Sequence, residues 1–294
     1  MSPGPFADRL AALVDERQSQ LCLGLDPDPS SLDRGFAEVG GSVAERAAVA
    51  VAAHCRSLIE RAGPACVAAK PQLACFERLG PPGWSALQRT VAAARDAGLV
   101  VIADGKRGDV PVSAAAYAQA LFGSTPTPWG EVAGLNVDAA TVSPLLGSDS
   151  LEPLIDGAAD AGAGLFVLVR TSNLGAADLL DLPAPDAPLF ERLAALVAAR
   201  ADRLMGECGL SGTGAVIGAT EPRHLSRLRE LMPRSIFLVP GVGAQGGRAA
   251  DLGPAFGEHP GSVLVTASRS IAGAPDPAAA ASELRAELWE LAGG

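Results

Sequence analysis

Four charged residues stand at the ends of short apolar runs in the N-terminal part of the chain. Asp26 and Lys70 each close one run, Asp104 closes a third, and Lys106 follows two residues later. Residues i and i+2 of an extended strand point to the same face, so Asp104 and Lys106 can share one side. Two acids and two amines at one place could bind a polar substrate and stabilise charge during a reaction. A structural salt-bridge network is the alternative, although protein cores normally avoid buried charges.

A second group of residues suits the binding of an anion. The segment PGVGAQGG (240–247) is rich in glycine and can turn backbone N–H groups toward a negative charge. Arg269 follows at the end of the next apolar run and could hold a phosphate through two hydrogen bonds. A glycine-rich turn beside a surface arginine would explain this segment alone. Combined with the acid and amine group, it indicates a site for a phosphorylated substrate.

These residues belong to a repeating pattern of elements. Short apolar runs that are continuous rather than alternating are typical of parallel strands covered on both faces. Segments with a helical pattern lie between the runs, and Pro and Gly separate the two kinds of element. The runs are 21–25, 66–70, 99–104, 139–143, 164–170, 214–219, 236–240 and 263–267, and the helical segments include 43–62, 84–97, 111–122, 187–208, 221–232 and 276–292.

Eight strand–helix repeats predict an α/β protein that is a single (β/α)₈ TIM barrel domain over residues 1–294. Residues 1–20 have an amphipathic pattern, and we expect a helix there that closes the bottom of the barrel. The Pro-rich stretches 124–130 and 182–188 are predicted loops, and the second could form part of a lid. Barrel enzymes carry their chemistry at the carboxyl ends of the strands, where the charged residues stand.

A doubly wound sheet that binds a dinucleotide is the structural alternative. The segment 241–246 matches GxGxxG, but it comes late in the chain. The strand after it ends in Ser268 and Arg269 instead of the acidic residue that would hold a ribose. No apolar run is followed by a GxxxxGK[ST] phosphate loop. The pattern therefore favours the barrel.

Composition limits the class of partner. Hydrophobic residues make up 48% of the 294 residues, so the chain can bury a large core without disulfides or metal. The net charge of -10 disfavours nucleic acid and anionic membranes, although a local cationic cluster could still hold a small anion. Five cysteines without CxxC, no secretory signal pattern and no long apolar stretch predict reduced thiols in a cytoplasmic protein.

Several segments together resemble the orotidine 5'-monophosphate decarboxylase family. DGKRGDV is similar to its DxKxxD signature, in the DxKRGD form of the type 2 subgroup found in bacteria. GLDPD, AKPQLACFE, DAATVSPLLGSDSLEPL, PGVGAQGG and VTASRSI agree as well, and the resemblance spans about residues 20 to 272. It implies a homodimer with active sites at the interface. Such an enzyme converts orotidine 5'-monophosphate to uridine 5'-monophosphate and carbon dioxide, the last step of de novo pyrimidine nucleotide synthesis, without metal or cofactor.

The resemblance implies catalytic roles for the charged residues. Lys106 resembles the residue that protonates C6 of the pyrimidine, and Asp104 the residue that faces the substrate carboxylate. Lys70 would complete an alternating Lys–Asp–Lys–Asp array and bind ribose, and Asp26 would hold a ribose hydroxyl. Decarboxylation leaves an electron pair at C6 that the ring delocalises poorly, so a fixed ammonium would stabilise it and then donate a proton. Asp104 between two lysines should stay ionised.

The resemblance also implies contacts farther from the reacting carbon. Asp109 would reach into the partner's site together with Ser113. Ser172 would contact the pyrimidine amide, and Gln245 and Arg269 would bind the phosphate. Remote phosphate binding would help drive closure of loops over the site.

Three rival functions remain distinguishable. A related sugar-phosphate decarboxylase or aldolase barrel uses DxKxxD with Mg²⁺, but it needs a carboxylate at the end of the second strand, where Lys70 stands. A catalytically inactive nucleotide-binding scaffold would bind uridylate and turn nothing over, and the intact Asp104, Lys106 and Asp109 disfavour it. A lyase that forms a Schiff base would be trapped by borohydride with substrate, and we expect no trapping.

Overall fold

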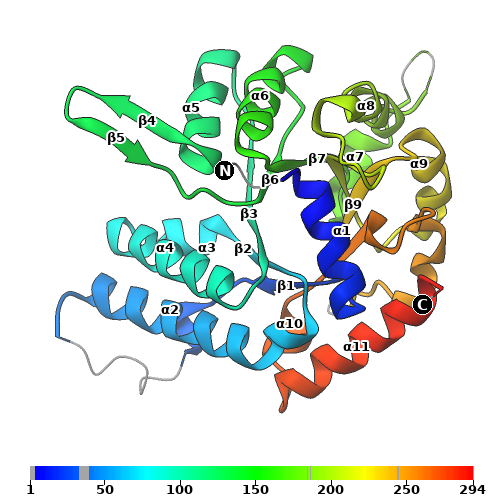
Figure 1. Ribbon diagram of the computed structural model, residues 1–294. Coiled ribbons are helices and arrows are strands. Elements are labelled where there is room, and N and C mark those ends of the chain that lie inside the picture. Colours follow the sequence, from blue (N-terminus) through cyan, green and yellow to red (C-terminus); the bar gives the residue numbers. More distant parts are fainter. Residues whose placement is uncertain (1–3, 33–39, 184, 186, 244, 294) are drawn as a thin grey trace.

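Eight parallel strands close into a barrel, in the order β1-β10-β9-β8-β7-β6-β3-β2. Helices surround this barrel on the outside (Figure 1). The computed structural model describes residues 4–32, 40–183, 185, 187–243 and 245–293. The prediction of a (β/α)₈ TIM barrel is confirmed, because parallel strands and helices alternate along the chain.

All eight predicted runs form barrel strands, and three have the predicted bounds. The strands are β1 (Leu21–Leu25), β2 (Ala68–Pro71), β3 (Val100–Arg107), β6 (Ala139–Val142), β7 (Gly164–Arg170), β8 (Ser211–Ile217), β9 (Ser235–Pro240) and β10 (Val263–Ala267). Strand β8 begins before its apolar run because two buried polar residues belong to it. The hydroxyl of Ser211 donates to the carbonyl of Ala201, and that of Thr213 donates to the carbonyl of Arg200.

Helices α2 (Val43–Ala62) and α5 (Pro111–Phe122) have the predicted bounds. Ser42 caps α2, since its hydroxyl accepts from Glu45 N while the Glu45 carboxylate accepts from Ser42 N.

No helix in the described part of the chain is long and apolar enough to cross a membrane. The other helices are α1 (Phe6–Arg17), α3 (Leu73–Glu77), α4 (Pro81–Asp96), α6 (Glu152–Ala161), α7 (Ala177–Leu180), α8 (Leu189–Ala198), α9 (Leu225–Leu231), α10 (Arg269–Ala272) and α11 (Pro277–Leu291).

The predicted helix 187–208 is wrong in its second half. Helix α8 ends at Ala198, and a 3₁₀ turn (Ala201–Leu204) follows it. Gly209 then adopts a φ of +82°, which favours glycine and lets the chain turn back toward β8. The predicted loop 182–188 includes residues 184 and 186, which lie outside the described residues.

The predicted loop 124–130 is wrong as well, because this stretch begins an antiparallel hairpin. Strands β4 (Ser124–Thr127) and β5 (Gly130–Ala133) pair with each other and project away from the barrel (Figure 1). Trp129 lies in the turn between them and is 93% exposed. Every residue of β5 is exposed, so the segment lacks the alternation of buried and exposed positions by which a strand is recognised.

Strand side chains form two separate apolar layers. One layer packs between the strands and the surrounding helices. The other fills the barrel and includes Ile102, Phe166 and Leu238. Helix α1 contributes Phe6 and Leu10 to this inner layer, and the Phe6 ring packs edge-on against Phe166 with centroids 5.9 Å apart. Helix α1 crosses in front of the barrel in Figure 1, at the end opposite the site described below.

We predict that Gly83→Ala destabilises the fold by about 1–3 kcal/mol, despite alanine's higher helix propensity. A Cβ at Gly83, in the first turn of α4, would lie 1.9 Å from the carbonyl oxygen of Phe76 at the end of α3. Gly253→Ala is the matched control, because a Cβ there meets no atom within 4 Å. Urea unfolding of both variants measures the difference, and equal stability of the two would contradict the close approach of α3 and α4.

Candidate active site

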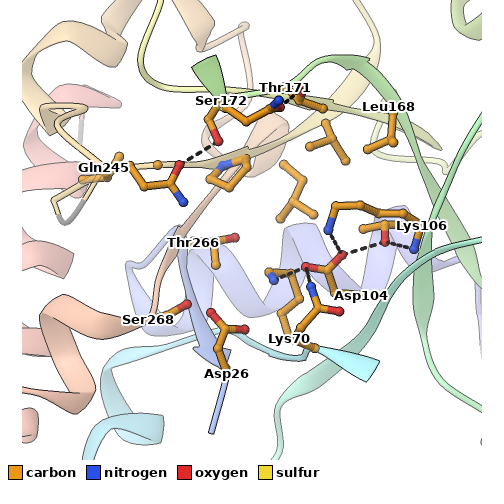
Figure 2. A pocket seen from close by; sticks show the side chains of 18 of the residues that line it. Asp26, Lys70, Asp104, Lys106, Leu168, Thr171, Ser172, Gln245, Thr266 and Ser268 are labelled. Carbon is orange, nitrogen blue, oxygen red and sulfur yellow. Dashed lines mark hydrogen bonds and ion pairs between the residues drawn. The ribbon is translucent and has the colours of Figure 1, made fainter. Parts of the chain in front are cut away.

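A cavity of about 470 Å³ opens at the carboxyl ends of the barrel strands. Barrel enzymes carry their chemistry at this end. Figure 2 shows side chains from separate strands pointing into one space. Seven of the nine predicted site residues line this cavity: Asp26, Lys70, Asp104, Lys106, Ser172, Gln245 and Arg269.

The Asp104 carboxylate lies at the centre of the charged group and is 5% exposed. Its Oδ1 accepts a hydrogen bond from Lys106 Nζ at 2.6 Å, and its Oδ2 pairs with Lys70 Nζ. Gln72 Nε2 donates to Oδ2 at 3.3 Å, and Thr141 Oγ1 donates to Oδ1 at 2.8 Å. Four donors from three strand ends therefore surround one buried acid (Figure 2).

The charges in the cavity stabilise each other's ionised forms. Burial alone would raise the pKa of the Asp104 carboxyl, but Lys70 and Lys106 outweigh burial and hold this pKa well below its ordinary value. Burial alone would lower the pKa of Lys70, but Asp104 and Asp26 outweigh it and raise this pKa. Asp104 and Lys70 are therefore both charged at neutral pH, and the cavity holds a preorganised electric field before any ligand enters.

The backbone of β3 is irregular where it carries these groups. Its pairing with β6 shifts between Ala103 and Arg107. Lys106 has a φ of +47°, a left-handed conformation that is uncommon outside glycine. Simple alternation along an extended strand predicts that Asp104 and Lys106 share a face, and their side chains do meet, although the backbone between them is bulged.

Lys70 and Lys106 are the only two lysines of this chain, and the other 21 of its 23 Lys and Arg residues are arginines. The side chain of Lys106 is 43% exposed toward the cavity mouth, whereas that of Lys70 is buried. An ammonium changes its protonation state far more readily than a guanidinium does. A sequence that uses arginine everywhere else and lysine only here therefore carries a signal for proton chemistry at this site.

The opposite side of the cavity carries the predicted phosphate residues. Ser172, just after β7, donates from its hydroxyl to Gln245 Oε1 at 2.8 Å, which joins the loops after β7 and β9. Arg269 is exposed at the beginning of α10 and also lines the cavity. Gly241 and Gly243 have positive φ values, as a tight glycine-rich loop requires. Ala244 of the predicted segment 240–247 lies outside the described residues.

Two predicted site residues lie outside this cavity of the single chain. Asp109 is half-buried beyond the end of β3, and its Oδ1 accepts from Val110 N at 2.8 Å. Ser113 is half-buried in the first turn of α5. Neither residue is among those that line the cavity.

Sequence analysis missed several residues that line the cavity. Gln72 and Thr141 contact Asp104 directly. Gln72 stands two residues after Lys70, a spacing that places both at one strand end. Thr141 lies inside the run 139–143, and the only signal was a hydroxyl residue near the end of an apolar run. Asn173 and Thr171 follow β7 beside Ser172.

The described residues contain no group of three or more His, Cys, Asp or Glu side chains placed to hold a metal ion. The cavity instead brings two ammonium groups and one guanidinium to its walls, from Lys70, Lys106 and Arg269. Leu168, Val216 and Leu238 line its floor, so the charged side faces an apolar one. This arrangement can hold an anion that has one polar and one flat, less polar part.

Comparison with known structures agrees with this architecture over the whole chain. The structure of Leishmania donovani OMP decarboxylase has 36% identity and a TM-score of 0.76, and the match covers 100% of each chain. The structure of Leishmania donovani UMP synthase has 37% identity and a TM-score of 0.77. That match covers 99% of this chain but only 57% of the longer UMP synthase chain.

Sequence comparison places the chain in one family. An orotidine 5'-phosphate decarboxylase of Rhodopirellula baltica is 41% identical over 273 residues, which cover 90% of this chain and 87% of the relative. The sequence model described as the orotidine 5'-phosphate decarboxylase / HUMPS family matches residues 19–284. The chain therefore belongs to the orotidine 5'-phosphate decarboxylase / HUMPS family.

Proposed function

We propose that this protein decarboxylates orotidine 5'-monophosphate to uridine 5'-monophosphate and carbon dioxide, in the last step of de novo pyrimidine nucleotide synthesis. The observation that carries the proposal is the Lys70–Asp104–Lys106 array in the wall of the cavity. Family membership and relatives that share the name and most of their length support it. Lys70 also disfavours the rival use of Mg²⁺, because an ammonium stands where that chemistry requires a carboxylate ligand.

The proposed reaction needs one proton and no external electrons. The bond between C6 and the carboxylate carbon breaks, the electron pair stays on C6, and carbon dioxide leaves. Lys106 then gives an Nζ proton to C6 and recovers a proton from water. Its ammonium, beside the ionised Asp104, stabilises the carbanion as charge develops. Lys106 is the more exposed of the two lysines, which suits a group that exchanges protons with solvent.

The remaining residues of the cavity would bind the nucleotide. Asp26 and Lys70 would hold ribose hydroxyls at the polar wall. Ser172 would bind the pyrimidine amide, and its bond to Gln245 would couple the pyrimidine to the phosphate end. Gln245 and Arg269 would bind the phosphate, with backbone N–H groups of the glycine-rich loop. We propose no metal or cofactor for this reaction, and a cytoplasmic location.

We also propose a homodimer with shared active sites. Asp109 and Ser113 lie outside their own chain's cavity, which suits residues that act across an interface. An apolar rim of exposed side chains surrounds this part of the barrel mouth, on the segments after β3, β6 and β7, and such patches mark interaction surfaces. The rim consists of Val110, Val112, Leu145, Leu146, Leu174, Leu179 and Leu182.

Orotidylate decarboxylation should be detectable by its absorbance change with purified protein in the presence of EDTA. We expect Lys106→Ala to abolish turnover and to change uridylate affinity by less than roughly threefold, because the ammonium acts mainly on charge that develops at C6. Arg89→Ala, which removes an exposed cation on α4, is the control and should retain full activity. Turnover of Lys106→Ala near the wild-type rate would refute its role. Wild-type protein that binds uridylate but releases no carbon dioxide would refute the reaction.

Arg269→Ala should lower kcat/KM, mainly by raising KM, because one charge-assisted phosphate contact is lost. The fall in kcat/KM should correspond to roughly 2–4 kcal/mol of lost transition-state stabilisation. Orotidine, which lacks the phosphate, should react at nearly the same slow rate with both proteins. Arg248→Ala is a matched control, since Arg248 is exposed near the same loop but does not line the cavity. An equal loss with both substrates would show that Arg269 does not bind phosphate.

Mixing two inactive variants should restore activity if the sites are shared. Lys106→Ala and Asp109→Ala homodimers should each be nearly inactive. Exchange of subunits makes about half of the dimers mixed, and each mixed dimer has one site with both changes and one with neither. We therefore expect roughly a quarter of the wild-type sites to return. Activity that stays at the sum of the two variants, with exchange verified by mass spectrometry, would place Asp109 in its own subunit's site.

A further inference from the structure

Strand β3 gains two residues relative to β6 at the site. Ala103 pairs with Ala140, and the next pair is Arg107 with Val142. Three residues of β3 (104–106) therefore stand opposite Thr141 alone. Such a bulge interrupts the ladder of backbone hydrogen bonds, so some backbone groups must find other partners.

A single hydroxyl group of β6 fills the gap that the bulge creates. Thr141 Oγ1 accepts a hydrogen bond from the backbone N–H of Lys106 at 3.0 Å. The same atom donates to Asp104 Oδ1 at 2.8 Å. Thr141 is 1% exposed, so water does not readily replace either bond. One side chain thus satisfies both the backbone of Lys106 and the carboxylate of Asp104.

The bond to Lys106 N acts on a residue in an unfavourable backbone conformation. A left-handed non-glycine residue is strained by about 1–2 kcal/mol and needs surrounding contacts to hold it. Lys106 adopts this conformation with a φ of +47°, and its Nζ turns back to Asp104 Oδ1 at 2.6 Å. The left-handed backbone and the returning side chain both depend on where the Lys106 peptide is held.

The chemistry of the two partners restricts which side chain can stand at position 141. The Lys106 N–H can only donate, and the ionised Asp104 carboxylate can only accept. A hydroxyl accepts from one group and donates to the other through the same atom, whereas an aliphatic side chain can do neither. Gln72 cannot take over, because it donates to the other carboxylate oxygen, Oδ2.

We propose that Thr141 is a positioning residue that holds Lys106 and Asp104 in register for proton transfer. It acts through these two residues and makes no bond to the reacting carbon. The proposal rests on the proposed function, because the decarboxylation gives the Lys106 ammonium its role. It adds that the hydroxyl of β6, and not the β3 sequence alone, determines where the proton donor stands.

Thr141→Val tests the proposal in steady-state kinetics, because valine has nearly the same shape and lacks the hydroxyl. We expect kcat to fall roughly 10- to 100-fold, the range for losing a hydrogen bond to a charged group together with a buried one. KM should change by less than about threefold, since the phosphate and ribose contacts remain. Thr141→Ser keeps the hydroxyl and should retain kcat within about threefold of the wild type.

Thr90→Val is the matched control for removing a buried hydroxyl. Thr90 is also 1% exposed, and its hydroxyl donates to the carbonyl of Ala86 within α4, away from the cavity. A loss of stability that lowers activity indirectly would affect Thr90→Val and Thr141→Val alike. A positioning role predicts a loss of kcat in Thr141→Val alone.

The two lysines of the chain allow a second measurement that does not depend on activity. Protein labelled with α-¹⁵N-lysine contains only two labelled backbone amides, those of Lys70 and Lys106. Hydrogen exchange of the Lys106 amide should be at least about tenfold faster in Thr141→Val than in wild type or Thr141→Ser, because its acceptor is lost. The Lys70 amide is the internal reference.

These two measurements separate failure of the proposal from failure of the proposed function. Wild-type protein without decarboxylase activity would refute the function, and the exchange data alone would then decide whether Thr141 holds the Lys106 backbone. Thr141→Val with wild-type kcat, or with unchanged exchange of the Lys106 amide, would overturn the proposal. Failure of Thr141→Ser to rescue both properties would overturn it as well.

Discussion

A buried carboxylate needs its charge compensated from several directions, and Asp104 imposes this requirement on the whole carboxyl end of the barrel. Leaving one partner out would expose an uncompensated charge to a low-dielectric interior, which costs several kcal/mol. β2 supplies Lys70, β3 supplies Lys106 and β6 supplies Thr141. These three strands are neighbours in the barrel, in the order β6-β3-β2, and this order brings all three donors to the same acid.

This requirement divides the barrel interior into two regions. Below the site, Phe166, Ile102 and Leu238 pack with Phe6 and Leu10 of α1 into an apolar layer. Above it, the strand ends carry charged and hydroxyl side chains that face a cavity of about 470 Å³. The apolar layer keeps water away from the lower side of the ion pairs, and so strengthens them relative to pairs in bulk solvent. The cavity then leaves Lys106 accessible where a ligand would enter.

Regular elements and side chains at strand ends could be predicted from the sequence, but features that depend on contacts between distant segments could not. Strand 164–170 and helix 43–62 were predictable because each carries its own pattern of apolar residues and, for the helix, a capping box. The start of β8 was not, since Ser211 is polar and belongs to the strand through its pairing with Ser235 of β9. The bulge in β3 was not predictable either, since the backbone N–H of Lys106 finds its acceptor on Thr141, 35 residues away in the chain. The β4–β5 hairpin, exposed on both faces, has no apolar period to detect.

The confinement of both lysines to the cavity has a consequence for chemical modification. Acylating agents and reducing sugars attack unprotonated primary amines, and the outer surface of this barrel offers arginine side chains, which do not react in this way at neutral pH. Lys70 and Lys106 are therefore the only side-chain amines at which acetylation or glycation can occur. Lys70 is buried and its pKa is raised, so Lys106 is the side chain that such reagents would reach. Under the role that we propose for Lys106, a single adduct there would be inactivating, and a bound nucleotide would protect against it.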